Sequence, residues 1–257
     1  MKRVPDTSEA EVIIAGDGRT VEERDLVFDI NECDRYALEE AVLLKEKFGG
    51  TVTALTLGPE GAADTLRRCL ATGADRVIML SDAAFAGSDA VTVAHILYRA
   101  IKDIQFDLVL AGAQASDDLQ AQVGPVLAEL LGTSHATIVT HLEIMNGKAK
   151  VHRELEGGLE AVVEIKLPAV ITIQTGINVP RYVSIMGIRK AARQEIKQLG
   201  LSELGLKESE VGEAGSKTRV ERLFLPVAEK NTEILTGSLG EIAARLAGII
   251  RDKGGLV

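Results

Sequence analysis

The stretch LVLAGAQASDDLQAQVG, residues 108–124, carries the strongest indication of the fold. It begins with a short apolar run that is typical of a buried strand, and small and polar residues follow from Gly112 onward. The residues from Ala121 to Leu131 have the apolar spacing of a helix. In open parallel sheets, ligands bind at the carboxyl ends of the strands, next to the N-termini of the following helices. The stretch therefore predicts a strand, a ligand-binding loop and a helix.

The same alternation of strand and helix continues on both sides of this stretch. Short runs rich in β-branched residues predict strands at 51–57, 76–80, 107–111 and 169–174. Apolar residues at helical spacing predict helices at 34–48, 62–71, 90–101 and 121–131. Such alternation with short links is typical of a parallel sheet that helices cover on both faces. We therefore expect an α/β fold with a doubly wound, mainly parallel sheet.

One excursion interrupts this alternation. Residues 137–143 and 148–153 both resemble strands, and Asn146–Gly147 lies between them. An Asn-Gly pair between two such runs is a strong signal for a β-hairpin. Residues 160–166 predict a third strand, after the turn at Gly157–Gly158. We expect a β-hairpin excursion from the parallel sheet.

The character of the sequence changes again after Pro180. Residues 187–231 are charged and lack a sustained apolar period, so we expect no independent core there. A last helix follows, for which Ser238 and Glu241 predict a capping box. Its apolar stripe consists of Ile242, Leu246, Ile249 and Ile250. We expect an α/β core at 1–186 and an extended C-terminal arm at 187–257 that contacts a partner; alternatively, the last helix docks on its own domain.

Bulk properties exclude several classes of protein. The formal net charge of −9 argues against nucleic-acid binding, because a phosphate-tracking surface needs clustered positive charge. No run approaches the about 18 apolar residues of a membrane span, and the polar start offers no signal-peptide core. Cys33 and Cys69 match no metal-binding spacing and are expected to be reduced thiols. We expect a cytoplasmic protein.

The sequence contains no recognisable catalytic constellation. It lacks a Gly-x-Ser-x-Gly elbow, a Walker motif and the Gly-x-Gly-x-x-Gly dinucleotide fingerprint. None of its histidines has a metal-ligand spacing; they are His95, His135, His141 and His152. On the residues alone, an enzyme active site is not supported, and no metal site is expected.

The loop after the strand at 107–111 is the best candidate for binding. Gly112 would allow close approach of the backbone, and the following helix would direct free N–H groups at an anion. Asp117 and Asp118 could accept hydrogen bonds from ribose hydroxyls. The alternative is that Ser116, Asp117 and Asp118 only cap the helix.

Six segments in register resemble the beta (small) subunits of electron transfer flavoproteins. Besides residues 108–124, they are KRVPDT at 2–7 with NECDRYALEEAVLLKEKFGG at 31–50, LTLGPEGAADTLRRCLATGADR at 55–76, VHRELEGGLEAVVEIKLPAVIT at 151–172, and PRYVSIMGIRKA at 180–191. The resemblance covers residues 1 to about 197 and weakens beyond. It implies a Rossmann-like core of the adenine-nucleotide-binding type.

The resemblance implies a heterodimer with an alpha subunit. FAD would lie mainly in the alpha subunit and carry electrons between acyl-CoA-type dehydrogenases and a downstream acceptor, so this chain would not itself be an enzyme. The beta subunit would hold AMP structurally. The residues implied at the nucleotide are Asn31, Glu32, Cys33, Asp34, Leu57, Gly112, Gln114, Asp117, Asp118, Gln120, Ala121, Gln122 and Val123.

The same resemblance assigns a partner-binding segment, Tyr182–Ile188. It would dock onto the client dehydrogenase as an exposed loop, with Ile185 and Met186 as its anchors. Adjacent apolar residues that neither a helical nor a strand period buries are typical of interaction sites. The alternative is that Ile185 fills the core.

The sequence departs from the family pattern at three points. Members usually begin with a hydrophobic strand before Lys-Arg-Val, whereas this chain starts at Met1, so we expect one central strand and one nucleotide contact to be missing from it. Ala121 and Val123 stand where AMP-binding members have asparagine and threonine, which favours an electron-bifurcating, NADH-oxidising form with a second FAD; Ala90, in place of a threonine, opposes that form. The spacing from Glu160 to Pro168 is one residue longer than usual. An alternative of another class is a stand-alone ATP- or AMP-binding stress-type protein.

Overall fold

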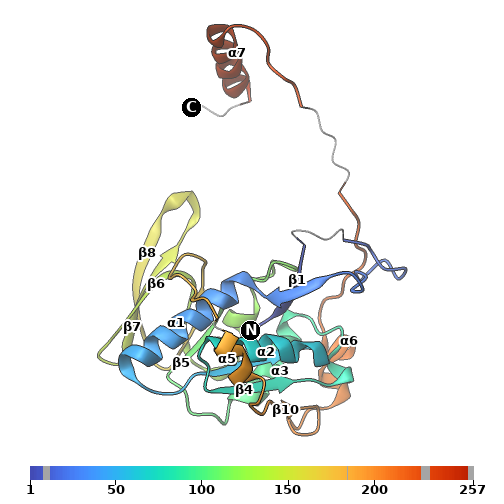
Figure 1. The fold of residues 1–257 in the computed structure, drawn as a ribbon, viewed down its shortest axis with the longest axis vertical. Helices are drawn as coiled ribbons and strands as arrows, with labels where there is room; N and C mark the ends of the chain where they lie inside the picture. The colour runs from blue at the N-terminus through green and yellow to red at the C-terminus, as the bar shows by residue number, and fades with distance from the viewer. Residues whose placement is uncertain (8–11, 184, 227–231, 254–257) are drawn as a thin grey trace. The chain divides into compact units, whose positions relative to one another are not determined.

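Strands and helices alternate along the first part of the chain, and they fold into a layered α/β unit (Figure 1). The computed structural model describes residues 1–7, 12–183, 185–226 and 232–253. Its contacts divide the chain into two units, Met1–Arg222 and Leu223–Val257.

Three parallel strands form the first sheet, in the order β10-β4-β3. Their bounds are β3, Thr53–Leu57; β4, Arg76–Leu80; and β10, Lys197–Leu199. The central strand β4 is buried on both faces, because its side chains alternate between two clusters. Val77 and Met79 pack against α1 and α2, whereas Ile78 and Leu80 pack with Ile96 of α3.

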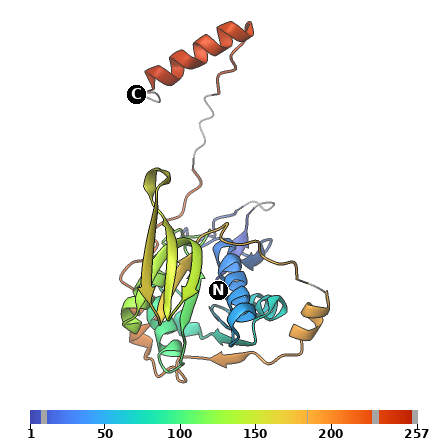
Figure 2. The same ribbon diagram turned by 90° about the vertical axis from the view of Figure 1, so that its left-hand side faces the viewer.

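Five strands form the second sheet, in the order β5-β9-β6-β7-β8. Their bounds are β5, Leu108–Gly112; β6, Ser134–Met145; β7, Lys148–Glu154; β8, Glu160–Lys166; and β9, Ala169–Ile173. Strands β5, β9 and β6 are parallel, and β6, β7 and β8 continue as the antiparallel ribbon coloured green to yellow in Figure 2. The predicted hairpin is confirmed: Asn146 and Gly147 turn the chain at φ 49° and 74°, in the left-handed region that Asn and Gly tolerate.

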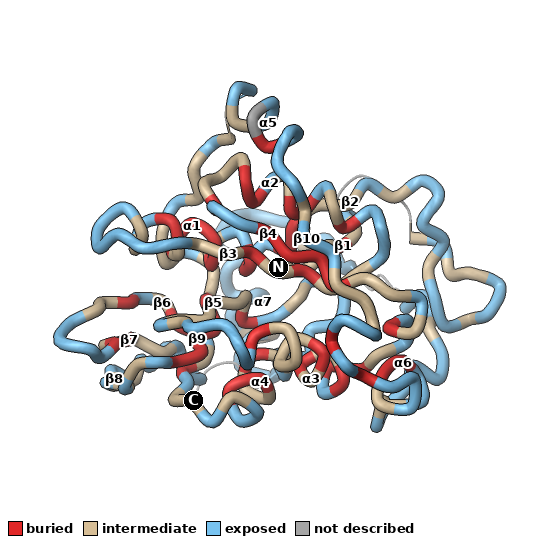
Figure 3. The backbone as a smooth tube through the Cα atoms, turned by 90° about the horizontal axis from the view of Figure 1, so that it is seen from below, coloured by how far each residue is buried: buried red, intermediate tan, exposed pale blue. Residues whose placement is uncertain are grey.

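Helices cover the parallel strands on both faces, as Figure 3 shows. The helices are α1, Glu32–Phe48; α2, Ala63–Thr72; α3, Ala90–Ile101; and α4, Val123–Leu131. Short 3₁₀ turns occupy Glu60–Ala62, Ala83–Phe85, Glu156–Gly158 and Glu208–Glu210. The doubly wound α/β class is confirmed. The parallel strands nevertheless lie in two sheets, with β3 at the end of one and β5 at the end of the other.

A small antiparallel pair lies at the start of the chain. It consists of β1, Arg3–Asp6, and β2, Val27–Ile30. The guanidinium of Arg3 stacks on the ring of Phe28, 3.3 Å from its centroid. The pairing brings Lys2 beside the start of α1, where Asn31 N donates to Lys2 O at 2.9 Å.

The predicted boundary between residues 186 and 187 is wrong, because the α/β unit extends to Arg222. Strand β10 pairs with β4, and Leu204, Leu206 and Val211 are buried in the cluster around Ile96. Two short helices, α5 at Ile185–Ala191 and α6 at Gly212–Gly215, belong to the same unit. This segment escaped prediction because its buried residues follow no single helical or strand period.

The second unit contains the predicted last helix, α7, at Leu239–Asp252. Its capping box is confirmed: Ser238 N donates to Glu241 Oε2 at 2.8 Å. Arg245 forms an ion pair with Glu233 ahead of the helix. None of the helix residues is buried, and Leu246 and Ile250 of the predicted stripe are exposed. Within residues 232–253 the apolar face of α7 therefore gains no core of its own.

Candidate functional site

Two buried side chains at the start of α1 organise the carboxyl end of β5. Asp34 Oδ1 accepts from Gly112 N at 2.7 Å, and Asp34 Oδ2 accepts from Lys2 N at 2.8 Å. Asn31 Nδ2 donates to Gln114 O at 2.8 Å, and Asn31 Oδ1 accepts from Ser116 N at 3.1 Å. The structure thus brings Asn31, Asp34 and Gly112 together as predicted. Their side chains are engaged by the chain itself, so they shape the loop.

Gly112 packs closely on the start of α1. A Cβ atom at this position would lie 2.9 Å from Asp34 N, 2.9 Å from Cys33 Cβ and 3.0 Å from Asn31 Nδ2. The close approach that glycine allows here is to the start of α1, and the expected approach to a ligand stays a prediction. Cys33 is buried, with its Sγ 3.8 Å from Gln174 Oε1, and burial raises the pKa of its thiol. It is a neutral packing group.

The two aspartates of the loop bind an ammonium group. Lys2 Nζ donates to Asp117 Oδ1 at 2.6 Å and to Asp118 Oδ2 at 2.7 Å. Partial burial lowers the pKa of Lys2, but the hydrogen bonds and charges of both carboxylates outweigh it, and the net pKa is raised. The alternative that these residues cap α4 is wrong, because α4 begins only at Val123, two residues later than predicted, and its N-cap residue is Gln122.

The first turn of α4 has no side-chain cap. Gln122 makes no capping hydrogen bond, and its backbone, at φ −99° and ψ −29°, lies outside the extended region that capping residues adopt. Behind it, Gly124 packs so closely on β9 that an added Cβ would lie 2.2 Å from Thr172 Cγ2. The helix start is thus fixed against the sheet while its N–H groups stay available for an anion.

The remaining predicted residues fall into three groups. Exposed residues around the loop are Glu32, Gln114, Gln120, Ala121 and Gln122. Val123 packs with Ile101 and Leu127 between α3 and α4. Leu57 ends β3 in the other sheet, where it packs near Ile78 and Leu80 rather than in the bonded group at the start of α1.

The donor set of this loop fits a nucleotide phosphate. The uncapped N–H groups of α4 suit an anion, and the exposed amides of Gln114, Gln120 and Gln122 suit hydroxyls or a base. The pairing of Lys2 with both aspartates offsets one of the two negative charges that would otherwise repel a phosphate. Across residues 1–7, 12–183, 185–226 and 232–253, no group of three or more His, Cys, Asp or Glu residues is arranged to hold a metal.

Sequence reasoning missed Lys2 and Gln174. Gln174 Oε1 faces Cys33 and accepts from Thr175 N at 2.9 Å, which ties the end of β9 to the start of α1. The only signal for Lys2 was its place in the segment KRVPDT, which carries part of the family resemblance. A single lysine has no spacing that predicts its partners.

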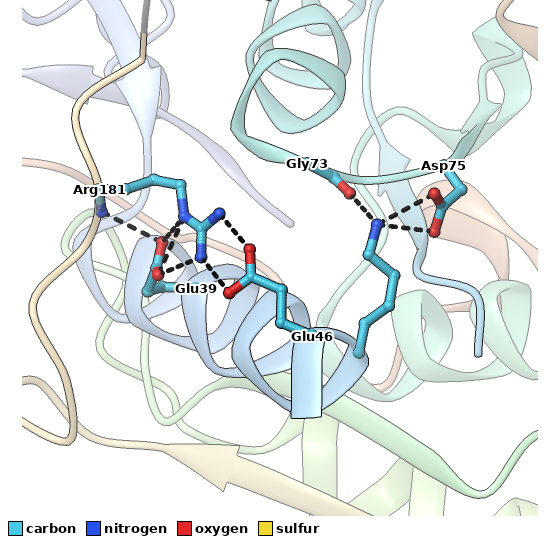
Figure 4. Close-up of polar contacts among 6 residues, drawn as sticks. Glu39, Glu46, Gly73, Asp75 and Arg181 are labelled. Atoms are coloured by element: carbon cyan, nitrogen blue, oxygen red, sulfur yellow. Dashed lines mark hydrogen bonds and ion pairs between the residues drawn. The ribbon is translucent and has the colours of Figure 1, made fainter. Parts of the chain in front are cut away.

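A second candidate site, for docking of a partner, follows β9, where an extended segment crosses α1. Arg181 lies between Glu39 and Glu46 (Figure 4), with Nη2 2.9 Å from Glu39 Oε1 and Nη1 2.7 Å from Glu46 Oε1. These hydrogen bonds, with Glu46 first, raise the pKa of Arg181 above its ordinary value. At the end of the same helix, Lys45 Nζ donates to Gly73 O at 2.6 Å. Arg181 therefore fixes the segment that leads to α5.

The predicted docking segment Tyr182–Ile188 is partly helical, which corrects the expected loop. Ser184 lies outside the described residues, and α5 begins at Ile185. Tyr182 is 93% exposed, Ile185 68% and Met186 81%, so Ile185 does not fill the core. The inner side of α5 instead contributes Ala191, which is buried against α2. Because α5 is short and packs on α2 through the small residue Ala191, its larger apolar side chains stay at the surface.

The fold and the site define a class: an α/β protein with a polar loop at the carboxyl edge of its parallel strands. The electron transfer flavoprotein domain model matches residues 19–204. "Electron transfer flavoprotein subunit beta" of Methylophilus methylotrophus is 42% identical over 243 residues, 93% of this chain and 92% of the relative. The protein of the same name from Thermoanaerobacterium thermosaccharolyticum is 41% identical over 247 residues, 96% of this chain and 94% of the relative.

A further relative has a different printed name. The "Caffeyl-CoA reductase-Etf complex subunit CarD" of Acetobacterium woodii is 39% identical over 255 residues, 98% of this chain and 96% of the relative. The chain belongs to the electron transfer flavoprotein family, among the beta subunits. Beta subunits of this family are electron transfer proteins rather than classical enzymes. Among the described residues, no helix has the length and apolar character that crossing a bilayer requires.

Proposed function

We propose that this chain pairs with an electron transfer flavoprotein alpha subunit and holds AMP at the loop between β5 and α4. The pair carries electrons on FAD between an acyl-CoA-type dehydrogenase and a downstream acceptor. FAD supplies the redox chemistry when it is bound. The observation that carries the nucleotide proposal is the uncapped start of α4, beside two aspartates that both pair with the ammonium of Lys2. The family match favours this subunit over a stand-alone ATP- or AMP-binding stress-type protein.

The chain's own residues divide the work at this site. Asn31 and Asp34 hold the loop against α1, so that its outer surface is preorganised. The N–H groups at the start of α4 receive the phosphate, because they lack partners and lie at the positive end of the helix dipole. The exposed amides of Gln114, Gln120 and Gln122 supply hydrogen bonds for the rest of the nucleotide.

Nucleotide content tests this proposal directly. The purified two-chain complex is denatured by heat, and the released nucleotides are separated by chromatography and quantified. We expect one FAD and one AMP per heterodimer. Gly112→Val is a poor probe, because it would disturb the contact between β5 and α1.

A charge placed at the start of α4 is the sharper variant. Gln122→Glu should weaken AMP binding by about tenfold, because the carboxylate competes with the phosphate for the same N–H groups. Gln105→Glu adds the same charge at an exposed position after α3 and should leave binding unchanged. A complex without AMP and with a single FAD would contradict the nucleotide proposal.

A second candidate is an electron-bifurcating, NADH-oxidising form with a second FAD at the same loop. Ala121 and Val123 favour it, because neither side chain offers a hydrogen bond and Val123 packs between α3 and α4. The relative CarD is named as a subunit of a caffeyl-CoA reductase-Etf complex. The same chromatography decides between the two: two FAD and no AMP per heterodimer would establish the second form.

We infer that the unit Leu223–Val257 binds the alpha subunit. The apolar side chains of α7 are without a core within the described part of this unit, and burying such a stripe is the main source of helix stability in proteins. Deleting residues 223–257 should weaken heterodimer formation in gel filtration. The unit Met1–Arg222 should keep its melting temperature. Normal pairing of the truncated chain would refute this assignment.

We infer that the client dehydrogenase docks on the surface formed by Tyr182, Ile185 and Met186. Exposed adjacent apolar residues on a segment that Arg181 fixes suit a docking site. Ile185→Ala should lower the rate of electron transfer from the dehydrogenase by about tenfold at unchanged flavin content and melting temperature. Val162→Ala, at another exposed position on β8, is the control. An unchanged transfer rate would exclude the assignment.

We place the complex in the cytoplasm. Cys33 and Cys69 are both free and buried, which suits a reducing compartment. Cell fractionation tests this placement, and recovery outside the cytoplasmic fraction would refute it.

A further inference from the structure

Lys2 connects three segments that are far apart in the sequence. Its backbone N donates to Asp34 at 2.8 Å, and its backbone O accepts from Asn31 N at 2.9 Å. Its side chain reaches the loop 113–122 through Asp117 and Asp118. The main chain of Lys2 is therefore fixed at the start of α1 while its ammonium holds the loop.

The loop that Lys2 holds contains two strained residues. Leu119 has φ 52° and Ala121 has φ 54°, in the left-handed region that costs free energy for any residue with a Cβ atom. Leu119 is 63% exposed, so burial does not compensate for this cost. Such strain persists only where neighbouring contacts impose it.

Asp118 transmits the hold of Lys2 to the strained residues. Asp118 Oδ2 accepts from Lys2 Nζ, while Asp118 Oδ1 accepts from Gln120 N at 3.0 Å. Leu119 N donates to Ala115 O at 2.9 Å in the same turn. The carboxylate thus connects the ammonium to the backbone between the two strained residues, directly before the start of α4.

We propose that Lys2 is a positioning residue for the nucleotide: its ammonium holds the strained loop 113–122 in place and offsets one of the two negative charges of Asp117 and Asp118 beside the phosphate site. This inference rests on the proposed nucleotide function. Lys2 acts through the two aspartates and is not a ligand of the phosphate. Without the ammonium, two uncompensated carboxylates repel the phosphate. The loop also loses the contact that holds Leu119 and Ala121 in their strained conformation.

Two measurements on the two-chain complex, freed of its bound nucleotide, test this role. Lys2→Gln should weaken AMP binding in calorimetric titration by about tenfold, since two charge-assisted hydrogen bonds are lost. It should also speed hydrogen exchange at the amides of Leu119 and Gln120 by about tenfold in the absence of nucleotide. Lys2→Arg should restore both, because a guanidinium can also bridge two carboxylates.

Lys45→Gln is the matched control. It removes an ammonium that holds the carboxylate of Asp75 at 3.0 Å, at the other end of α1. It should change neither AMP binding nor the exchange of Leu119 and Gln120. If wild type binds AMP and Lys2→Gln binds it equally well, the role of Lys2 alone is overturned. If wild type binds no adenine nucleotide, the proposed function fails and the role of Lys2 toward a nucleotide fails with it.

Discussion

The loops 81–89 and 113–122 occupy comparable places in the fold and are used in opposite ways. Each follows a parallel strand, each precedes a helix on the same face of the sheets, and each contains two aspartates. In the first loop, Asp82 and Asp89 accept hydrogen bonds from backbone N–H groups. In the second, Asp117 and Asp118 accept from the ammonium of Lys2. The difference lies in the partner, not in the loop.

The first loop is closed by a distant part of the same chain. Asp89 caps α3 through Thr92 N at 2.9 Å, and it also accepts from Lys217 N at 2.7 Å and Thr218 N at 2.9 Å. Asp82 Oδ2 accepts from Leu201 N at 2.9 Å. The donors at the start of α3 are therefore used within the protein, and the segment 197–218 gains its anchors.

The second loop leaves its helix start open. Its aspartates bind a side chain, and the N–H groups of α4 receive no carboxylate from the loop. Two aspartates before a helix thus build a structural latch where backbone donors reach them. Where a lysine holds them, they leave the start of the helix without a carboxylate cap.

The largest expected effect comes from opening the closed loop. Asp89→Ala should lower the free energy of unfolding by about 3 kcal/mol, because it removes a helix cap and leaves the buried N–H group of Thr92, and the half-buried ones of Lys217 and Thr218, without an acceptor. Urea unfolding of the full chain measures this. Asp103→Ala, at an exposed position after α3, is the control and should change little. Equal stabilities of the two variants would contradict the latch.

The latch should also depend on pH. Burial raises the pKa of Asp89, but the N–H groups of Thr92, Lys217 and Thr218 outweigh it and bring the pKa to about 2, from an ordinary value of 3.8. Because the folded pKa is the lower one, the stabilisation is fully present above about pH 4 and is lost as the pH falls toward 2. Between about pH 5 and about pH 2, the free energy of unfolding of the wild type should therefore fall more steeply than that of Asp89→Asn. Parallel curves would refute this.

A smaller effect is expected at the other aspartate of the closed loop. Asp82→Ala removes the acceptor of Ala84 N at 3.0 Å and of Leu201 N at 2.9 Å, both near the surface. It should cost about 1 kcal/mol, since water can replace these bonds in part. Hydrogen exchange should rise at Leu201 but not at Thr218, which depends on Asp89. A rise at both would mean that the two aspartates act as one unit.

The sequence predicted both loops equally well as parts of strand-loop-helix units, because the apolar periods of the flanking strands and helices are local. Strand β4 and helix α3 were predicted at their observed bounds, since buried β-branched runs and apolar helical spacing follow directly from the residues. The partners of the loops were not predictable in this way. Asp89 depends on Thr218 and Asp117 depends on Lys2, and both pairs are separated by more of the chain than any periodic pattern covers.

The same limit explains the misplaced boundary and the unpredicted packing of one site residue. Strand β10 has three residues, two of them exposed, so it carries no apolar signal, and its pairing with β4 alone places it in the sheet. Gly112 was correctly placed at the end of β5. Whether it faces a ligand or α1 depends on packing between elements, which a single glycine does not reveal.

The smallest expected effect concerns the open helix start and has the opposite sign. Gln122→Glu should raise the free energy of unfolding of the nucleotide-free chain by about 0.3 to 0.5 kcal/mol, because a negative charge interacts favourably with the uncapped N–H groups of α4. The gain should disappear at about 1 M salt, where exposed charges are screened. Gln105→Glu, which is not at a helix N-terminus, should bring no such gain. Because the open start of α4 is the feature proposed to receive the phosphate, the same variant that stabilises the free chain should weaken its binding of AMP. A chain that gains stability and also keeps its affinity would show that the phosphate binds elsewhere.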